Sequence, residues 1–471
     1  MSTIKDKLPQ KFKEEMKELL GDEYSDFLES YNNPRTNSIR INNLKIGREK
    51  FISLKLFDID FDKDAVDWSD IGYYIDSDLS PGKNALHDAG AFYIQEPSAM
   101  SVVGCTDIKK NEHILDLCAA PGGKSTYILS KLENTGLLVS NEIDSTRIKA
   151  LGENLERFGA INSIITNTDS KRLLTFFKGY FDKVFIDAPC SGQGMFRKDE
   201  YAINDWSESK VEECVSIQKK IIEDGFAMLK DGGMLIYSTC TFTKRENEDI
   251  IEEFLANHSS AKFVNSHRIW PHKDRGEGHY CARIIKINNP LDLECDSDDY
   301  SINEINNKIK EPKNRILSKK NKKSRNNSDL VLYNEFIEGI IKRNSSFLKK
   351  VEGHNIIKKG NMIYSVPDIG IDLSGLKMLR SGICLGEIKK NRFEPSHSLA
   401  SALHTEDVNF YIDFENESKE IKKYILGESI ETGKSRGWIL VTVDGVSIGW
   451  GKESNGVLKN KYPKGLRRAI K

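Results

Sequence analysis

Short apolar runs alternate with helical stretches through the middle of the chain, and this alternation limits the possible folds more than any other feature. Five of these runs have the length of buried strands: His113–Leu117, Leu137–Asn141, Ser163–Thr166, Lys183–Ile186 and Met234–Tyr237. The clearest helical pattern is Glu208–Leu229, which we expect the stretch Asp231-Gly232-Gly233 to end as a glycine C-cap. The alternation predicts an α/β fold with a mostly parallel, doubly wound sheet.

The sequence predicts further domains on both sides of this core. Helical periodicity followed by an alternating strand at Ser38–Asn42 predicts a small α+β module. Near the other end, Val408–Phe414 has strand character, and Asp444-Gly445 between the apolar runs Trp438–Val443 and Val446–Trp450 predicts a β-hairpin. We therefore expect five segments: an N-terminal α+β module (1–70), the α/β core (71–290), a charged linker (291–330), an intermediate segment (331–400) and a β-rich, basic domain (401–471).

Charge and cysteine content bound the class of protein. The 471 residues are 30% charged with a net charge of −1, which is no overall nucleic-acid signature. The basic half of the linker could be a solvated tether or could hold a phosphate backbone. No apolar run is long enough for a membrane span, the opening residues lack the apolar core of a signal peptide, and none of the eight cysteines forms a CxxC pair. We expect a cytoplasmic protein with reduced thiols and no metal site, and a monomer by default.

A glycine-containing loop follows the first strand of the core. The stretch ILDLCAAPGGKST, Ile114–Thr126, predicts a strand, a loop of small residues and a helix start. Gly122 and Gly123 permit a tight turn, and the N–H groups of the following helix could then hold a carboxylate or a phosphate. The pattern is neither GxGxxG nor a Walker A loop, so neither a dinucleotide nor ATP is indicated. A turn without a ligand remains an alternative.

Three acidic residues follow the next three strands. Glu142 comes 24 positions after Cys118, and Asp169 and Asp187 follow the third and fourth strands. Each of them alone could be a helix cap. Because ligands of open α/β sheets bind at the carboxyl ends of the strands, the three acids together with the glycine loop favour a ligand site.

Two cysteines stand just beyond strand ends. Cys190 follows the strand that ends at Ile186, and Cys240 follows the strand that ends at Tyr237. Either could be a reactive thiol or a buried packing residue. The other cysteines lack such a context, and we expect them to serve in packing: Cys105, Cys214, Cys281, Cys295 and Cys384.

These motifs resemble those of the bacterial RNA cytosine-5 methyltransferases, S-adenosylmethionine-dependent enzymes of ribosomal RNA. The resemblance is carried, in the family's order, by YIQEPSAM (Tyr93–Met100), CAAPGGK (Cys118–Lys124), NEIDSTR (Asn141–Arg147), DAPCSGQGMFRKD (Asp187–Asp199) and YSTCTFTKRENE (Tyr237–Glu248). The flanking SIRINNLKI and NKYPKGLRR are similar to the subgroup called RsmF, which modifies the small ribosomal subunit.

The resemblance implies a Rossmann-like methyltransferase core, a C-terminal PUA-like RNA-binding domain, and ribosomal RNA or the small ribosomal subunit as partner. It implies that the glycine loop holds the methionine part of the cofactor, Glu142 the ribose and Asp169 the adenine amino group, and that Lys124 and Asp187 lie near the reacting base. The implied cofactor residues are Cys118, Ala119, Ala120, Pro121, Gly122, Gly123, Lys124, Glu142, Asp169 and Asp187.

Methylation at C5 of cytosine requires a nucleophile, because C5 attacks a methyl group only after a thiolate has added to C6. The chemistry permits either cysteine; the family pattern assigns the attack to Cys240 and product release to Cys190. Asp187 could protonate the ring if burial raised its pKa. Phe196, Arg197 and Lys198 could line a pocket for the flipped base or form an ordinary loop.

Other functions remain open at this point. The chain could be a non-catalytic ribosome-assembly factor that kept the fold, a methyltransferase of another RNA such as tRNA, or a DNA or small-molecule methyltransferase. A DNA enzyme should depend on Cys190 alone, whereas amino-methylating enzymes need no thiol nucleophile.

Overall fold

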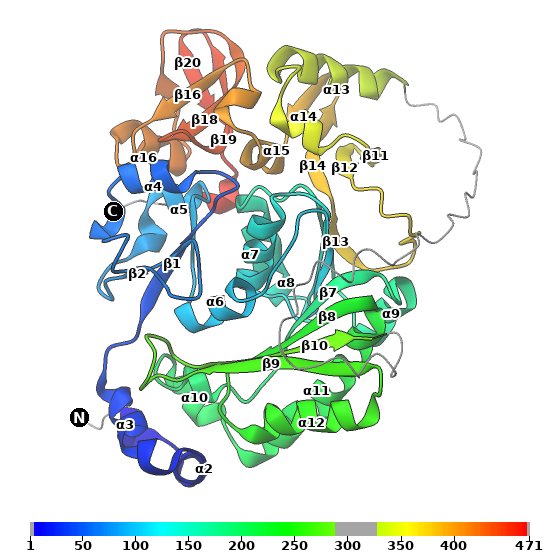
Figure 1. Cartoon of the computed structure of the whole chain (residues 1–471). Helices are drawn as coiled ribbons and strands as arrows, with labels where there is room; N and C mark the ends of the chain where they lie inside the picture. The colour runs from blue at the N-terminus through cyan, green and yellow to red at the C-terminus, as the bar shows by residue number, and fades with distance from the viewer. Residues whose placement is uncertain (1–3, 288–326, 469–471) are drawn as a thin grey trace.

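A central sheet of eight strands organises the protein (Figure 1). The computed structural model describes residues 4–287 and 327–468, so most of the expected linker, residues 291–326, lies outside the described residues. The strand order is β13-β6-β5-β4-β7-β8-β10-β9. Its parallel centre consists of β4 (His113–Asp116), β5 (Leu137–Asn141), β6 (Ser163–Thr166), β7 (Phe181–Asp187) and β8 (Leu229–Thr239).

Helices cover both faces of this sheet (Figure 1). On one face lie α6 (Pro97–Gly104), α7 (Gly123–Leu132) and α8 (Arg147–Arg157), and on the other lie α9 (Ser170–Phe177), α11 (Glu208–Met228) and α12 (Glu248–Asn257). The five expected strands are present, and the doubly wound, mostly parallel sheet is confirmed. Two strands, β9 (Ala261–Ile269) and β10 (His279–Lys286), extend it antiparallel beyond β8.

The long helix expected at Glu208–Leu229 is confirmed as α11, but the cap expected after it is wrong. We expected Asp231-Gly232-Gly233 to cap it, but α11 ends at Met228, and the three residues lie inside β8. Leu229 already pairs with Phe181 of β7, and the register shifts before Met234 pairs with Lys183. Gly232, with φ of +79°, therefore allows the irregular backbone at this register shift of the strand. The fully buried Leu229 is held by the neighbouring strand, a contact that local sequence does not reveal.

The N-terminal region contains two separate packing units. Helices α1 (Ile4–Lys7), α2 (Gln10–Leu20) and α3 (Tyr24–Glu29) pack beside α10 (Glu200–Asp205). A three-stranded sheet follows, in which β1 (Asn37–Ile41) pairs with β2 (Gly72–Ile75) and β3 (Phe92–Ile94), with α4 (Arg48–Ser53) and α5 (Ala85–Asp88) beside it. The sheet joins both sides of the boundary expected at residue 70.

The C-terminal residues build two further sheets. One consists of β11 (Asn355–Lys359), β12 (Met362–Val366), β14 (Ile383–Lys389) and β15 (Arg392–Pro395), with α13 (Asn327–Ile340) and α14 (Ser346–Lys350) nearby. Between β12 and β14, β13 (Met378–Ser381) leaves this sheet and pairs with β6 of the central sheet. The intermediate segment is therefore attached directly to the edge of the core.

The last sheet contains the expected hairpin. Its order is β16-β18-β19-β20-β17, where β18 (Gly437–Val443) and β19 (Val446–Ser454) are joined by Asp444 and Gly445, both with positive φ. The other elements are α15 (His397–Ala402), β16 (Tyr411–Phe414), α16 (Lys419–Leu426), β17 (Ile430–Glu431) and β20 (Val457–Asn460). The hairpin prediction is confirmed, whereas the strand expected from Val408 begins only at Tyr411.

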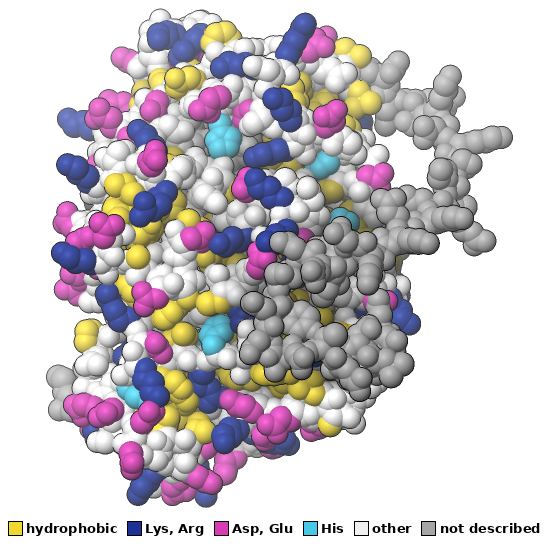
Figure 2. Space-filling model, viewed as in Figure 1, with side chains coloured by type: hydrophobic (Ala, Val, Ile, Leu, Met, Phe, Trp, Pro, Cys, Tyr) yellow, Lys and Arg dark blue, Asp and Glu magenta, His cyan; other side chains and the backbone are white. Residues whose placement is uncertain are grey.

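Charges of both signs are interspersed over the face shown in Figure 2. That distribution agrees with the net charge of −1. None of the described helices is both long and apolar enough to cross a membrane.

Candidate active site

The glycine loop connects β4 to α7 at the carboxyl edge of the sheet. Gly122 adopts a φ of +111°, which strains any residue with a side chain, and an added Cβ would lie 3.2 Å from Leu151. The loop is held from outside: the Ala120 N–H donates to the Glu142 carboxylate over 3.2 Å, and Arg147 donates to the Ala120 carbonyl over 2.7 Å. These hydrogen bonds fix the backbone that leads into the first turn of α7, as expected for a loop that binds a ligand.

An arginine of the N-terminal sheet supports the same turn. Arg40, on β1, is fully buried and donates from Nη2 to the Gly123 carbonyl (3.1 Å) and the Thr126 hydroxyl (2.7 Å). Its guanidinium also lies over the Tyr127 ring, 4.5 Å from the centroid. The role of Arg40 was not predicted from the sequence, because its position in an apparently alternating strand gives no sign that its side chain reaches the glycine loop.

The expected acids have different environments. Glu142 is buried and accepts hydrogen bonds from the backbone N–H groups of Ala120 and Asp144. Ile143, next in sequence, is 68% exposed, which offers an apolar surface beside that carboxylate. Asp169 is exposed and accepts from the Arg172 N–H as the N-cap of α9. Strand order brings the three acids to one edge, although no contact joins Asp169 to the other two.

A fourth acid, Asp116, was not predicted. It is fully buried at the end of β4 and accepts a hydrogen bond from the Ser125 hydroxyl over 2.6 Å. Burial raises the pKa of Asp116 to about 7, helped by the charges of Asp187 and Glu142 and opposed by Ser125 and Lys124. Its other oxygen has no hydrogen-bond partner among the described residues. Asp116 stands within an apolar strand and before the recognisable glycine loop, so its role was not evident from the sequence.

The buried Lys124 forms an ion pair with the half-buried Asp187. Lys124 Nζ lies 2.7 Å from Asp187 Oδ2, while the Ser238 hydroxyl donates to Oδ1 over 3.1 Å. His279 Nε2 lies 3.7 Å from Oδ1. Burial, assisted by the charge of Lys124, lowers the pKa of His279 to about 3, so this imidazole is neutral at physiological pH.

The expected protonation of Asp187 is wrong. Burial tends to raise its pKa, but the Lys124 ammonium and the hydrogen bonds from Lys124 and Ser238 outweigh burial and leave the pKa below the ordinary value. Asp187 is therefore a carboxylate at neutral pH. The pKa of Lys124 is raised in turn, because attraction to Asp187 and Asp116 exceeds the cost of burial.

The two cysteines face each other. Their Sγ atoms lie 3.3 Å apart, within hydrogen-bonding distance for thiols. The hydrogen bond to Cys240, burial, and the negative charges of Cys240 and Glu246 raise the pKa of Cys190 well above its ordinary value. Parallel pairing of β7 with β8, in which Asp187 lies opposite Ser238, produces this approach.

The two cysteine loops also interlock through their backbones. The Gln193 side-chain oxygen accepts hydrogen bonds from the N–H groups of Phe242 (3.0 Å) and Thr243 (2.9 Å). In the other direction, the Gly194 N–H donates to the Cys240 carbonyl over 2.8 Å. An added Cβ on Gly194 would lie 2.9 Å from that carbonyl oxygen, so the close approach requires glycine. The thiols are thus held by a rigid, doubly linked pair of loops.

The residues after the Pro-Cys motif do not line a pocket as proposed. Phe196 is fully buried and packs edge-on against Phe12 of α2. Arg197 is also buried, in an ion pair with Glu277 over 2.6 Å. Only Lys198 is exposed. The first two residues instead attach the N-terminal helices to the core.

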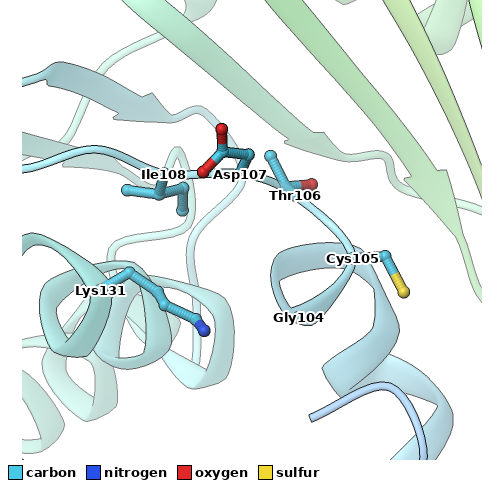
Figure 3. Close-up of a pocket in the computed structure, with 6 residues that line it drawn as sticks. All are labelled: Gly104, Cys105, Thr106, Asp107, Ile108 and Lys131. Carbon is cyan, nitrogen blue, oxygen red and sulfur yellow. The ribbon is translucent and has the colours of Figure 1, made fainter. Parts of the chain in front are cut away.

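The cysteines expected to serve in packing have different environments. Cys214 and Cys281 are buried, in agreement with packing, and Cys384 is partly buried, but Cys105 is exposed; Cys295 lies outside the described residues. Cys105 is among the residues that line a hollow of about 360 Å³ near the end of α6. In Figure 3 its sulfur points away from Lys131 of α7, another lining residue. This open hollow shares no residue with the predicted site. Among the described residues, no group of three potential metal ligands occurs.

Family models match almost the whole described chain. The model of the 16S rRNA methyltransferase RsmB/F covers residues 104–285, and that of the N-terminal domain of RsmF covers residues 8–97. Two further models, the first C-terminal domain and the PUA domain of RsmF, cover residues 341–403 and 411–468. A relative from Vibrio vulnificus, "Ribosomal RNA small subunit methyltransferase F", is 30% identical over 98% of both chains. The chain belongs to the RsmF family of ribosomal RNA methyltransferases.

Further comparisons agree with membership of the RsmF family. The protein of the same name from Vibrio parahaemolyticus is 31% identical over 94% of both chains. The crystal structure of a methyltransferase homologue from Pyrococcus horikoshii is 26% identical, with a TM-score of 0.52 over 60% of this chain and 99% of that one. NSun6 from the same organism, solved with SFG, is 21% identical with a TM-score of 0.50, which supports the fold alone. The Rossmann-like methyltransferase core with a β-rich PUA-containing region is thereby confirmed.

Proposed function

We propose that the protein transfers a methyl group from S-adenosylmethionine to C5 of cytosine in small-subunit ribosomal RNA, through a covalent adduct with Cys240. One observation carries the proposal: two thiols 3.3 Å apart stand beside the Lys124–Asp187 ion pair, at the sheet edge that also holds the glycine loop. Methylation of an RNA amino group or ribose would not need a pair of thiols there.

The residues present are suited to the cofactor. The loop from Cys118 to Lys124 would hold its methionine part, and the buried Glu142 has a second lone pair on each oxygen for the two ribose hydroxyls. Ile143 would contact the adenine face, and Asp169 its amino group. When bound, S-adenosylmethionine supplies a methyl group on a positively charged sulfur.

Cys240 performs the attack. Its thiolate forms a bond from Sγ to C6 of the cytosine, and the electron pair displaced from the C5–C6 double bond makes C5 nucleophilic toward the methyl group. The negative charge that develops on the ring needs a cation. Lys124 supplies it, since its raised pKa keeps the ammonium protonated and its charge interacts with Cys240. Asp187 keeps Lys124 in place rather than acting as the acid.

Cys190 completes the reaction. As a thiolate, after its own proton has passed to water, it accepts the proton of C5 and becomes a thiol. The electron pair of the C5–H bond restores the C5–C6 double bond, the Sγ–C6 bond breaks, and Cys240 leaves as a thiolate. The 3.3 Å separation of the sulfurs supports this division, because two thiols so close can reach neighbouring carbons of one ring.

The flanking modules would position the RNA. The PUA-type sheet presents an apolar and basic surface, with Lys452 and Lys461 both within 6 Å of the Trp438 ring centroid. Such a surface can contact phosphates and bases of folded RNA. The names of the relatives support the small subunit as substrate, and we infer a cytoplasmic location from that substrate.

Bisulfite mapping of ribosomal RNA tests the proposal. A strain lacking this protein should lose 5-methylcytosine at one or more positions of 16S RNA and regain it with the wild-type chain, but not with Cys240→Ser. The purified protein should transfer tritiated methyl groups to small subunits or their RNA from that strain. Unchanged methylation at every 16S position, or loss confined to transfer RNA, would contradict the substrate.

A further inference from the structure

A buried carboxylate lies behind the cysteine pair and has no role in the reaction described above. Glu246, in the short helix Lys244–Glu246 after the Thr-Cys motif, is fully buried. It accepts the Ser191 N–H over 2.9 Å and also the Ser191 hydroxyl. The Tyr237 hydroxyl donates to its main-chain carbonyl over 2.7 Å and fixes the residue from β8. The carboxylate thus grips the residue that directly follows Cys190.

The other side of Cys190 is tied to the same carboxylate. Gln218, in α11, donates from Nε2 to Glu246 over 3.1 Å and to the Pro189 carbonyl over 2.9 Å. Pro189 and Ser191 flank Cys190, so the loop is held before and after the thiol. The Ser191 hydroxyl also lies 3.0 Å from the Thr241 hydroxyl, next to Cys240. Glu246 therefore sets where the Cys190 loop stands against the Cys240 loop.

The charges around this carboxylate are unbalanced. Among the described residues, no lysine, arginine or histidine forms an ion pair with Glu246, and its hydrogen-bond donors are neutral. Burial raises the pKa of Glu246, while the hydrogen bonds from Ser191, Gln218 and Thr241 oppose that rise. The ionisable groups that face it are Cys190, Cys214 of α11 and Tyr237 of β8, whose pKa values are all raised. The cation of the site, Lys124, interacts instead with Cys240.

We propose that Glu246 is a positioning residue for Cys190: it holds the Pro-Cys loop against Cys240 and keeps Cys190 protonated until the proton at C5 must be removed. The inference deepens the proposed function, on which its catalytic part rests. The negative charge of Glu246 disfavours ionisation of Cys190, so Cys190 keeps its proton in the resting enzyme. Cys190, once ionised, is then the stronger base for removing the C5 proton.

Glu246→Gln tests the charge with little change of shape. An amide oxygen can still accept from Ser191 and Gln218, while the negative charge is lost. We expect carbamidomethylation of Cys190 by iodoacetamide in the full-length protein without RNA, followed by peptide mass spectrometry, to become faster at neutral pH. The increase is about tenfold for each unit by which the pKa falls. With RNA and cofactor, the ratio of covalent adduct to free enzyme should rise, because release depends on Cys190.

Glu212→Gln is the matched control. Glu212 is an exposed glutamate that pairs with Arg245, the residue before Glu246, so the same substitution there should change neither the alkylation nor the adduct. Ser191→Ala is a second variant, for use if Glu246→Gln does not fold. Removing a hydroxyl that donates to the carboxylate leaves its charge less compensated, so alkylation of Cys190 should slow.

Three results would overturn the inference. These are an unchanged alkylation profile of Cys190 in Glu246→Gln, a change confined to Cys240, and loss of adduct instead of accumulation. Because alkylation needs no RNA, it judges the influence of Glu246 on Cys190 even if the substrate were not ribosomal RNA. A failed methyl-transfer assay with the wild-type protein would instead count against the proposed function.

Discussion

The Pro-Cys loop and the Thr-Cys loop begin alike and end in opposite surroundings. Each follows a parallel strand of the same sheet, and the strands are paired so that Asp187 lies opposite Ser238. The residues on either side of Cys190 are nevertheless hydrogen-bonded to the buried Glu246 or to its partner Gln218. Cys240 instead interacts with the positive charge of Lys124. Position at a strand end brings the two thiols together, and under the proposed mechanism the charges beyond the strands distinguish the thiol that attacks from the thiol that releases the product.

Replacing each cysteine tests this division most strongly. Cys240→Ser should lower methyl transfer at least about a thousandfold and form no adduct, because a hydroxyl is a much poorer nucleophile than a thiolate. Cys190→Ser should also stop turnover, but only after the adduct has formed, which would appear as a slowly migrating band on a denaturing gel. An adduct in Cys240→Ser, with none in Cys190→Ser, would reverse the roles.

Removing the cation should affect only the Cys240 side. Lys124→Met is expected to lower methyl transfer by about a hundredfold to a thousandfold, and adduct formation with it, because charge on the ring is no longer stabilised. Lys183→Met is a matched control, since Lys183 is a buried lysine paired with Glu112 at the other end of the sheet. It should cost stability and leave the activity of the folded protein intact. Accumulation of adduct in Lys124→Met would contradict the assignment.

The carboxylates of Asp187 and Asp116 should change the free energy of unfolding with pH in opposite directions. Ionised Asp187, whose pKa is lowered in the fold, contributes stability above the ordinary carboxyl pKa and loses it as the pH falls through its folded value. Asp116, with a pKa raised to about 7, costs stability as the pH rises from about 4 toward 7.

Urea unfolding at several pH values measures this difference. Asp116→Asn should remove a loss of a few kcal/mol between about pH 4 and about pH 7, whereas Asp187→Asn should remove a smaller loss on the acid side. Equal slopes for the wild-type protein and Asp116→Asn would show that Asp116 is not the titrating group.

Of these substitutions, the smallest effect is expected at Arg245, the residue before Glu246. Arg245 is paired with Glu212 on the surface, at 2.9 Å, and exposed pairs contribute little. Arg245→Ala should therefore lower the free energy of unfolding by no more than about 1 kcal/mol and leave methyl transfer unchanged, in contrast to its buried neighbour. A loss of activity in Arg245→Ala would suggest that the surface pair, rather than Glu246, supports the loop.

What could be predicted from the sequence was local. The strand ends that carry Glu142, Asp187, Cys190 and Cys240 follow from short apolar runs and from motifs with fixed spacing. The hairpin at Asp444-Gly445 follows from turn chemistry, since both residues need positive φ. Each of these features is decided within about ten residues of chain.

What the sequence did not reveal depends on partners far along the chain. Arg40 reaches the loop 83 positions later, and Phe196 was mistaken for a pocket residue because Phe12 buries it from the N-terminus. The pKa of Asp187 could not be assigned from burial alone, because the direction of its shift is set by Lys124 on α7 and Ser238 on β8. Spacing identifies a strand end but does not show which charges meet there.

Trapping the adduct tests the central claim most directly. Small-subunit RNA made with 5-fluorocytosine should hold the wild-type enzyme in a covalent complex. Fluorine replaces the C5 hydrogen that must be removed as a proton after methyl transfer, so the adduct cannot be released. Proteolysis and mass spectrometry then identify the modified peptide. Our account predicts a methylated fluorocytosine nucleotide on the peptide that contains Cys240. The same nucleotide on the peptide that contains Cys190 would contradict it.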